Sequence, residues 1–155
     1  GPRNAHIDAL LARQKAGGAP ANLYYTGYVE NPAEALARLD VLVSLSHFQE
    51  SFGRTVLEAM AAARPVICYD WGALPELVVD EQTGYVVPFR DVDAVVDHLI
   101  ALAAAPERRQ AMGLAGRERA LNEFAPEVFR RRLSGVYAAL LGQRSSDAAS
   151  SFIVE

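Results

Sequence analysis

The chain has 155 residues, and 51% of them are hydrophobic, which is enough apolar side chain for the core of one compact domain. Its formal net charge of −4 argues against a nucleic-acid partner, because nucleic-acid-binding proteins normally present a basic face. Cys68 is the single cysteine, so no internal disulfide can form, and its apolar neighbours predict a buried thiol in a cytoplasmic protein. No apolar run approaches the roughly 18 residues of a membrane span.

Helices and strands alternate along most of the chain. The predicted elements are, in chain order, a helix at 5–15, a strand at 23–29, a short helix at 32–39, a strand at 41–45, a helix that begins after Ser51, a strand at 65–69, one or two helical turns at 74–79, a strand at 84–88, and helices at 91–105, 106–122 and 126–141. Residues 3–142 are predicted to form one domain, and residues 143–155 a flexible tail.

This order of elements predicts the fold class. Strands that alternate with helices through short links indicate right-handed βαβ units, and therefore an α/β fold with a Rossmann-like parallel sheet and helices on both faces. The apolar run at 41–45 is nearly continuous, which is typical of a strand buried on both faces. Ligands of such sheets bind beyond the carboxyl ends of the strands, so the crevice is expected at the loops 28–31, 46–53 and 70–74.

The most informative segment runs from Glu50 to Ala61 and reads Glu-Ser-Phe-Gly-Arg-Thr-Val-Leu-Glu-Ala-Met-Ala. Backbone N–H groups at a helix start lack intrahelical acceptors, so Gly53, Arg54 and Thr55 can hold a diphosphate, with the Arg54 guanidinium as a further contact. The plainer interpretation is an ordinary helix start, with Ser51 as its cap and Gly53 required only by the loop.

Two glutamates flank this helix start. Glu50 is either a carboxylate stabilised by the helix dipole or one that faces the hydroxyls of a sugar in the crevice. Glu58 lies off the predicted apolar stripe of the helix, so it is either a solvated surface residue or an acceptor for two adjacent ribose hydroxyls. At the end of the first predicted strand, Val29 and Glu30 could flank a nucleobase, although such strand-end residues are also common without a ligand.

The motifs together are more specific than any one of them. They are Tyr-Thr-Gly-Tyr-Val at 25–29, Asp-Val-Leu-Val-Ser-Leu-Ser at 40–46, the segment 50–61, Arg-Pro-Val-Ile at 64–67, Gly-Ala-Leu-Pro-Glu at 72–76 and Thr-Gly-Tyr-Val-Val-Pro at 83–88. In this order they resemble the C-terminal donor-binding domain of retaining GT-B glycosyltransferases, in glycosyltransferase family 4. The resemblance covers residues 23–140.

The resemblance implies a role for each residue of the motif. Glu50 looks like the catalytic glutamate that contacts the transferred sugar, and Glu58 like the glutamate that binds the donor ribose. The donor-binding run between them comprises Ser51, Phe52, Gly53, Arg54, Thr55 and Val56. Val29 and Glu30 match the stretch that lines the nucleobase. Two departures stand out: only Arg3 could replace the family's basic pair on the diphosphate, and Ala63 stands where the family often has glycine.

The resemblance also implies the reaction and the partners. The expected reaction is the transfer of a hexose-type sugar from a nucleoside diphosphate sugar with retention of configuration, without a metal or another cofactor. An N-terminal acceptor-binding domain is expected outside this chain, and any membrane contact is expected through that domain. We therefore expect the chain alone to fold, to bind nucleotide weakly and to transfer nothing.

Three alternatives remain at this stage. The first is a nucleotide- or sugar-sensing module with the same sheet, and the second is a GT-B phosphorylase or epimerase domain. The third is a flavodoxin-like receiver or interaction domain. A receiver needs a lysine at a late strand end, whereas Lys15 in the first predicted helix is the single lysine of the chain.

Overall fold

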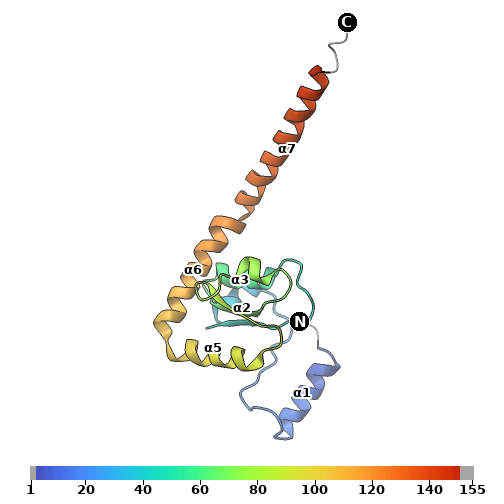
Figure 1. The fold of residues 1–155 in the computed structure, drawn as a ribbon. Helices are drawn as coiled ribbons and strands as arrows, with labels where there is room; N and C mark the ends of the chain where they lie inside the picture. Colours follow the sequence, from blue (N-terminus) through green and yellow to red (C-terminus); the bar gives the residue numbers. More distant parts are fainter. Residues whose placement is uncertain (1–2, 151–155) are drawn as a thin grey trace.

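A parallel sheet forms the centre of the molecule (Figure 1). In this computed structural model, which describes residues 3–150 and the side chains of residues 3–142, the sheet has the strand order β1-β2-β3. The strands are β1 (Leu42–Ser44), β2 (Val66–Tyr69) and β3 (Gly84–Val87). Their register places Val66 opposite Leu42 on one side and Gly84 on the other. The predicted α/β fold with a parallel sheet is confirmed.

Helices cover both faces of the sheet. The helices of the described residues are α1 (Ala5–Lys15), α2 (Pro32–Ala37), α3 (Arg54–Ala61), α4 (Leu74–Leu77), α5 (Val92–Ala104), α6 (Pro106–Phe124) and α7 (Pro126–Ser150). On β2, Val66 and Cys68 belong to the core under α3 and α4, whereas Ile67 and Tyr69 belong to the core under α5. Since successive side chains of a strand point to opposite faces, β2 connects the two cores.

Two strand predictions are wrong. Residues 23–29 form no strand, and Gly27 there has a φ of +74°, a left-handed conformation that interrupts an extended ladder. Tyr24 and Tyr28 are each 82% exposed, so these aromatic side chains do not belong to the core. β1 is not buried on both faces, because it pairs only with β2 among the described strands and leaves Val43 37% exposed.

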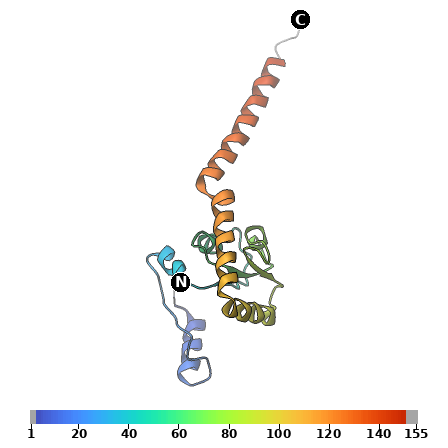
Figure 2. The ribbon, with the colours of Figure 1, turned by 90° about the vertical axis from the view of Figure 1, so that its left-hand side faces the viewer.

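The two ends of the chain lie away from the sheet (Figures 1 and 2). Asn4 caps α1 by accepting a hydrogen bond from the Ile7 N–H, and Gly17 follows the helix with a φ of +75°. α7 continues to Ser150, beyond the predicted end at Leu141, and projects away from the body of the domain. The tail predicted for residues 143–155 is therefore helical to Ser150, and residues 151–155 lie outside the described part.

Cys68 lies in the core between the sheet and α3. Its side chain has no exposed surface, and burial, together with the nearby carboxylates of Asp70 and Asp80, raises the pKa of the thiol to about 12. At neutral pH the thiol is therefore protonated and unreactive. The predicted buried thiol is confirmed. Among the described residues, no helix is both long enough and apolar enough to cross a membrane.

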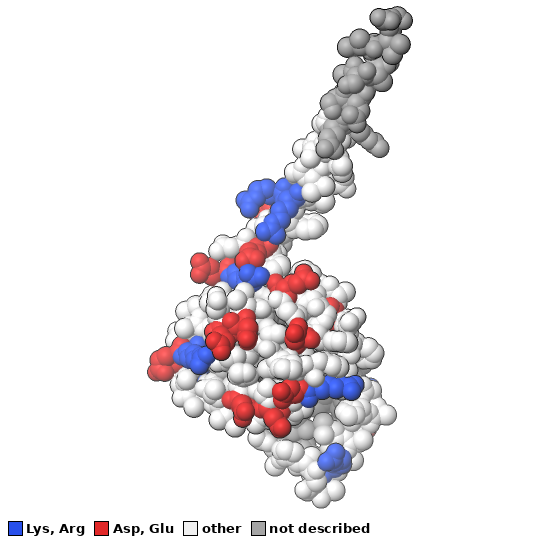
Figure 3. Space-filling model, viewed as in Figure 1, with Lys and Arg blue, Asp and Glu red and all other residues white. Residues whose placement is uncertain are grey.

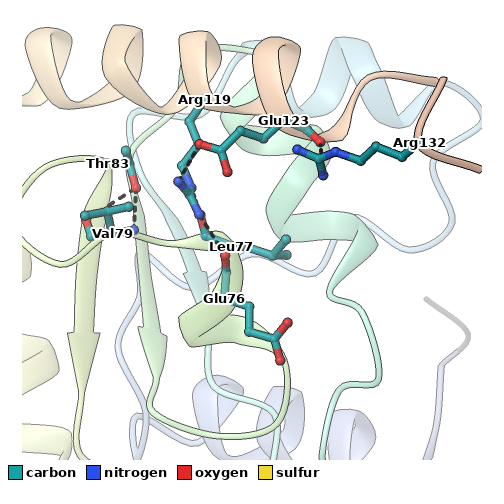
Figure 4. A network of polar contacts seen from close by, with 7 residues as sticks. All are labelled: Glu76, Leu77, Val79, Thr83, Arg119, Glu123 and Arg132. Atoms are coloured by element: carbon teal, nitrogen blue, oxygen red, sulfur yellow. Dashed lines mark hydrogen bonds and ion pairs between the residues drawn. The ribbon is translucent and has the colours of Figure 1, made fainter. Parts of the chain in front are cut away.

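Arg119 of α6 fixes the short helix α4 (Figure 4). Its Nε donates to the Leu77 carbonyl at 2.9 Å, one terminal nitrogen donates to the Glu76 carbonyl at 3.0 Å, and the other pairs with Glu123 at 2.7 Å. A single guanidinium thus satisfies two carbonyls at the end of a helix of one turn. In this way α6 positions α4 beside the loop 70–74.

We expect Arg119→Leu to lower the free energy of unfolding by about 2–3 kcal/mol, because hydrogen bonds to a charged group are lost and two carbonyls lose their donors. Urea unfolding followed by circular dichroism measures this loss. Arg131→Leu is the matched control, since Arg131 is exposed on α7. Equal stability of the two variants would contradict the role given to Arg119.

Candidate functional site

The loops after β1 and β2 meet at the carboxyl edge of the sheet. The Ala73 N–H donates to the Glu50 carbonyl at 2.9 Å. Gly72 has a φ of +65°, and a Cβ at this position would lie 2.6 Å from the Glu50 oxygen and 2.8 Å from its nitrogen. The loop 70–74 therefore holds the main chain of Glu50 in place through a contact that only glycine permits.

The start of α3 is left open to a ligand. Gly53 is its N-cap residue with a φ of +80°, no side chain caps the first turn, and this turn has no acidic residue. Ser51 is therefore not the cap, in contrast to the plainer interpretation of the sequence. No side chain accepts a hydrogen bond from the first N–H groups of α3. These groups are therefore available to a ligand, and the helix dipole favours a negative group at this position.

Three neighbouring hollows lie beside α3 and α2. The first, of about 230 Å³, is lined by Glu50, Gly53, Arg54, Thr55 and Val56 together with β1. The second, of about 460 Å³, is lined by Arg54 and Glu58 and, across from them, by the start of α2. The third, of about 830 Å³, contains Val29, Glu30 and α2. Arg54 lines the first two hollows and Asn31 the last two, so the three are neighbours, and together they are called the groove.

Within the groove, Arg54 pairs with Glu58. Its Nε and one terminal nitrogen donate to the same carboxylate oxygen, at 3.2 and 3.1 Å. The second oxygen of Glu58 is not used by this pair, and the carboxylate is 39% exposed. The sequence predicted a diphosphate contact for Arg54, whereas the structure directs it to the glutamate one turn later on the same helix.

Glu50 and Glu58 line different hollows, on either side of Arg54. This arrangement separates the two carboxylates along the groove, so they do not converge on one atom as an acid–base pair would. It suits instead two contacts at different parts of an elongated ligand. Ser51 and Phe52 line none of the three hollows; Ser51 is exposed, and the Phe52 side chain is 48% exposed.

Asn31 is the site residue that the sequence reasoning missed. Its side chain caps α2 by accepting from the Glu34 N–H at 3.4 Å, and it donates to the Glu34 carboxylate at 2.9 Å. Asparagine directly before Pro32 is a recognisable helix-start signal, and α2 faces α3 across the groove. The sequence therefore contained a signal for the cap and placed the loop 28–31 at the crevice, but it did not single out Asn31 within that loop.

An aromatic group lies beyond Glu50 at the same edge of the sheet. Trp71, after β2, stacks on Phe89, after β3, with ring centroids 4.4 Å apart. His47, from the loop after β1, meets Phe89 edge-on at 5.9 Å. The three side chains connect the three strand-end loops, so His47 has a packing role.

Charges are mixed over the surface. Figure 3 shows small basic groups interspersed with acidic ones on the face that it presents, without a continuous basic patch. Arg3, the single candidate for the diphosphate-binding pair, forms an ion pair with Asp8 of α1 instead. In the described part of the chain, the arginines that line the groove are Arg54 and Arg38, and the open start of α3 adds its helix dipole.

Comparison with known proteins agrees with this geometry. Residues 8–119 match the family described as Glycosyl transferases group 1. The chain is 33% identical, over 91% of its length, to the lipopolysaccharide core biosynthesis mannosyltransferase LpsB of Rhizobium meliloti, and covers 40% of that protein. It is 34% identical, over 76% of its length, to the N-acetyl-alpha-D-glucosaminyl L-malate synthase of Bacillus anthracis, and covers 30% of it.

Solved structures show the same fold. The sucrose-phosphate synthase of Thermosynechococcus elongatus superposes with a TM-score of 0.77 at 27% identity, over 90% of this chain and 35% of that one. The C-terminal domain of the LpcC protein of Francisella tularensis superposes with a TM-score of 0.68 at 28% identity, over 81% of this chain and 66% of that domain. Anabaena HepE, solved in complex with UDP, shares the fold with a TM-score of 0.79 at 16% identity, over 86% of this chain and 36% of that one.

Proposed function

The chain belongs to the Glycosyl transferases group 1 family, and we propose that it is the part of a retaining hexosyltransferase that binds the nucleoside diphosphate sugar. It spans 30–40% of the length of the two curated relatives described above. We propose that the acceptor is bound by a further N-terminal domain, so the 155-residue chain alone binds nucleotide weakly and transfers no sugar. The assignment to glycosyltransferase family 4 is part of this proposal.

The groove beside the open start of α3 carries the proposal. From the third to the first, its three hollows match the parts of a nucleotide sugar in order. The base lies at Val29 and Glu30, the ribose at Glu58 and the sugar at Glu50. The diphosphate then lies at the amides of residues 53–56, between the two glutamates, where the helix dipole opposes its charge.

Each residue has a distinct task in this arrangement. The free oxygen of Glu58 and the one shared with Arg54 accept hydrogen bonds from two adjacent ribose hydroxyls. Glu50, held by Gly72 and Ala73, faces the transferred sugar and keeps its carboxylate away from the diphosphate. The amides at the start of α3 stabilise the charge that develops on the leaving diphosphate, so no metal or other cofactor is invoked.

The names of the relatives support a hexose-type donor. They include a phosphatidyl-myo-inositol mannosyltransferase of Mycobacterium leprae, 32% identical over 84% of this chain and 35% of that protein. Mannose and N-acetylglucosamine, named among the relatives, are both hexose-type sugars. We propose a cytoplasmic enzyme whose membrane contact, if it has one, is made by the N-terminal domain.

The proposal is tested by thermal shift with UDP, GDP, ADP and their sugars. We expect one base to raise the melting temperature selectively, because a ligand that binds only the folded state stabilises it by mass action. Glu58→Gln should weaken binding of that nucleotide at least about tenfold, since a hydrogen bond to a charged acceptor is replaced by a neutral one. Binding constants from isothermal titration measure the change.

Glu118→Gln is the matched control, because Glu118 is an exposed glutamate on α6 outside the groove. If both variants bind nucleotide equally well, Glu58 has no ribose role. If no nucleotide binds at millimolar concentration, the chain holds no donor site of its own. Binding of a free sugar without any nucleotide would favour a sensor module instead.

A further inference from the structure

A fourth hollow, which is not part of the groove, lies at the edge of the sheet where the strands begin. It encloses about 400 Å³ and is lined by Asp40, Ala63, Arg64, Pro65, Pro106, Arg109, Gln110 and Leu114. Asp40 precedes β1 and Pro65 precedes β2, and parallel strands begin at the same edge of a sheet. The hollow therefore shares no residue with the groove, and nothing in the proposed donor site explains it.

Arg64 is the unexplained group in this hollow. Its Nε is buried and has no hydrogen-bond partner, and its guanidinium takes part in none of the ion pairs found in the described part of the chain. The neighbouring Arg109, in contrast, donates to the Leu102 carbonyl at 2.8 Å and pairs with Asp40 at 3.4 Å. The buried Nε–H without an acceptor is unfavourable, and the guanidinium has no acidic partner among the described residues, so Arg64 is available to an anion in the hollow.

The charge and polarity of the walls define that acceptor. Two arginines and one aspartate give the hollow a net charge of +1, which matches a single negative charge. Gln110 adds a neutral hydrogen-bonding amide, and the remaining walls at Pro65, Pro106 and Leu114 are apolar. A planar carboxylate carries one negative charge and matches the fork of a guanidinium through two parallel hydrogen bonds, and apolar walls suit a hydrocarbon body.

We propose that this hollow binds a small organic monocarboxylate, with its carboxylate on Arg64 and its apolar body against Pro65, Pro106 and Leu114. The site is separate from the donor groove, since the two share no lining residue: the groove reaches Ala61 and Ala62 at the end of α3, and the hollow begins at Ala63. The inference does not depend on the proposed function, and nucleotide binding is not needed to test it.

Benzoate and its uncharged analogue benzamide are the probes, titrated into the ¹⁵N-labelled 155-residue chain and followed by NMR. We expect benzoate to shift the Arg64 Nε–H signal and the amides of residues 63–65 and 107–110, and benzamide to bind at least about tenfold more weakly. Shifts at the α3 start alone, or equal binding of the two probes, would overturn the proposal.

Two variants test the role of each charge. Arg64→Gln should weaken benzoate binding about tenfold or more, whereas the control Arg131→Gln, at an exposed position on α7, should leave it unchanged. Asp40→Asn should strengthen binding several-fold, because it removes the opposing negative charge and releases Arg109; the Asp40 side chain is 81% exposed, so its replacement is compatible with folding. Benzoate affinity that stays the same in both Arg64→Gln and Asp40→Asn would refute the site.

Discussion

Gly113→Ala is expected to lower the free energy of unfolding by about 2–3 kcal/mol, although alanine is the better helix former. Gly113 lies in α6 where this helix crosses the end of α3. A Cβ there would overlap the Ala63 carbonyl oxygen and lie 2.9 Å from its carbon. Both atoms belong to the backbone, so a rotamer change cannot relieve the overlap, and α6 must move away from the core.

The conformation of Ala63 makes this contact rigid. Ala63 has a φ of +58°, the left-handed conformation that usually ends a helix with glycine, and it turns the chain from α3 toward β2. Glycine adopts this conformation without strain, whereas Ala63 adopts it at a cost of about 1 kcal/mol. Displacing the Ala63 carbonyl would disturb the turn that sets the register of β2.

Gly135→Ala on α7 is the matched control for Gly113→Ala. A Cβ at Gly135 would meet no atom within 4 Å, so this substitution changes helix propensity alone and should stabilise the helix by up to about 1 kcal/mol. Urea unfolding of both variants separates propensity from close packing. If Gly113→Ala were as stable as Gly135→Ala, α6 and α3 would not approach as closely as described.

The sequence predicted well those elements whose pattern reflects burial. β2 and β3 are short apolar runs bounded by turn residues, and α5 and α6 begin at an aspartate cap and at a proline. The segment 23–29 has the same composition as a strand, yet its tyrosines are exposed and Gly27 breaks the extended conformation. A segment with the composition of a strand therefore forms one only where a neighbouring strand pairs with it, and the fold decides whether such a neighbour exists.

The candidate site was predicted in its residues but not in its contacts. The spacing of Glu50 and Glu58 locates the groove, since both lie near a helix start at the carboxyl edge of the sheet. Arg54 could reach either a phosphate or Glu58, because residues four apart on a helix are neighbours, and the sequence contains no signal that decides between them. Asn31 enters the site only through the packing of α2 on α3.

Gly72→Ala is expected to weaken binding of the nucleotide sugar more than binding of the free nucleotide. The substitution places a Cβ 2.6 Å from the Glu50 oxygen, so the loop 46–53 must shift and the hydrogen bond from Ala73 to Glu50 is strained. Under the proposed function, Glu50 faces the sugar and Glu58 the ribose. The shift should therefore reduce affinity for the sugar-bearing donor about tenfold and leave the nucleotide contacts at Glu58 largely intact.

Gly17→Ala separates this contact from simple backbone strain. Gly17 has a φ of +75°, similar to that of Gly72, but a Cβ there would meet nothing within 4 Å. Both variants should lose about 1 kcal/mol of stability through the left-handed conformation, whereas only Gly72→Ala should change the ratio of the two affinities. Isothermal titration with the base selected by thermal shift, with and without its sugar, measures that ratio. A ratio that is the same in both variants would remove Glu50 from the sugar end of the groove, because its position would then not depend on the loop that holds it.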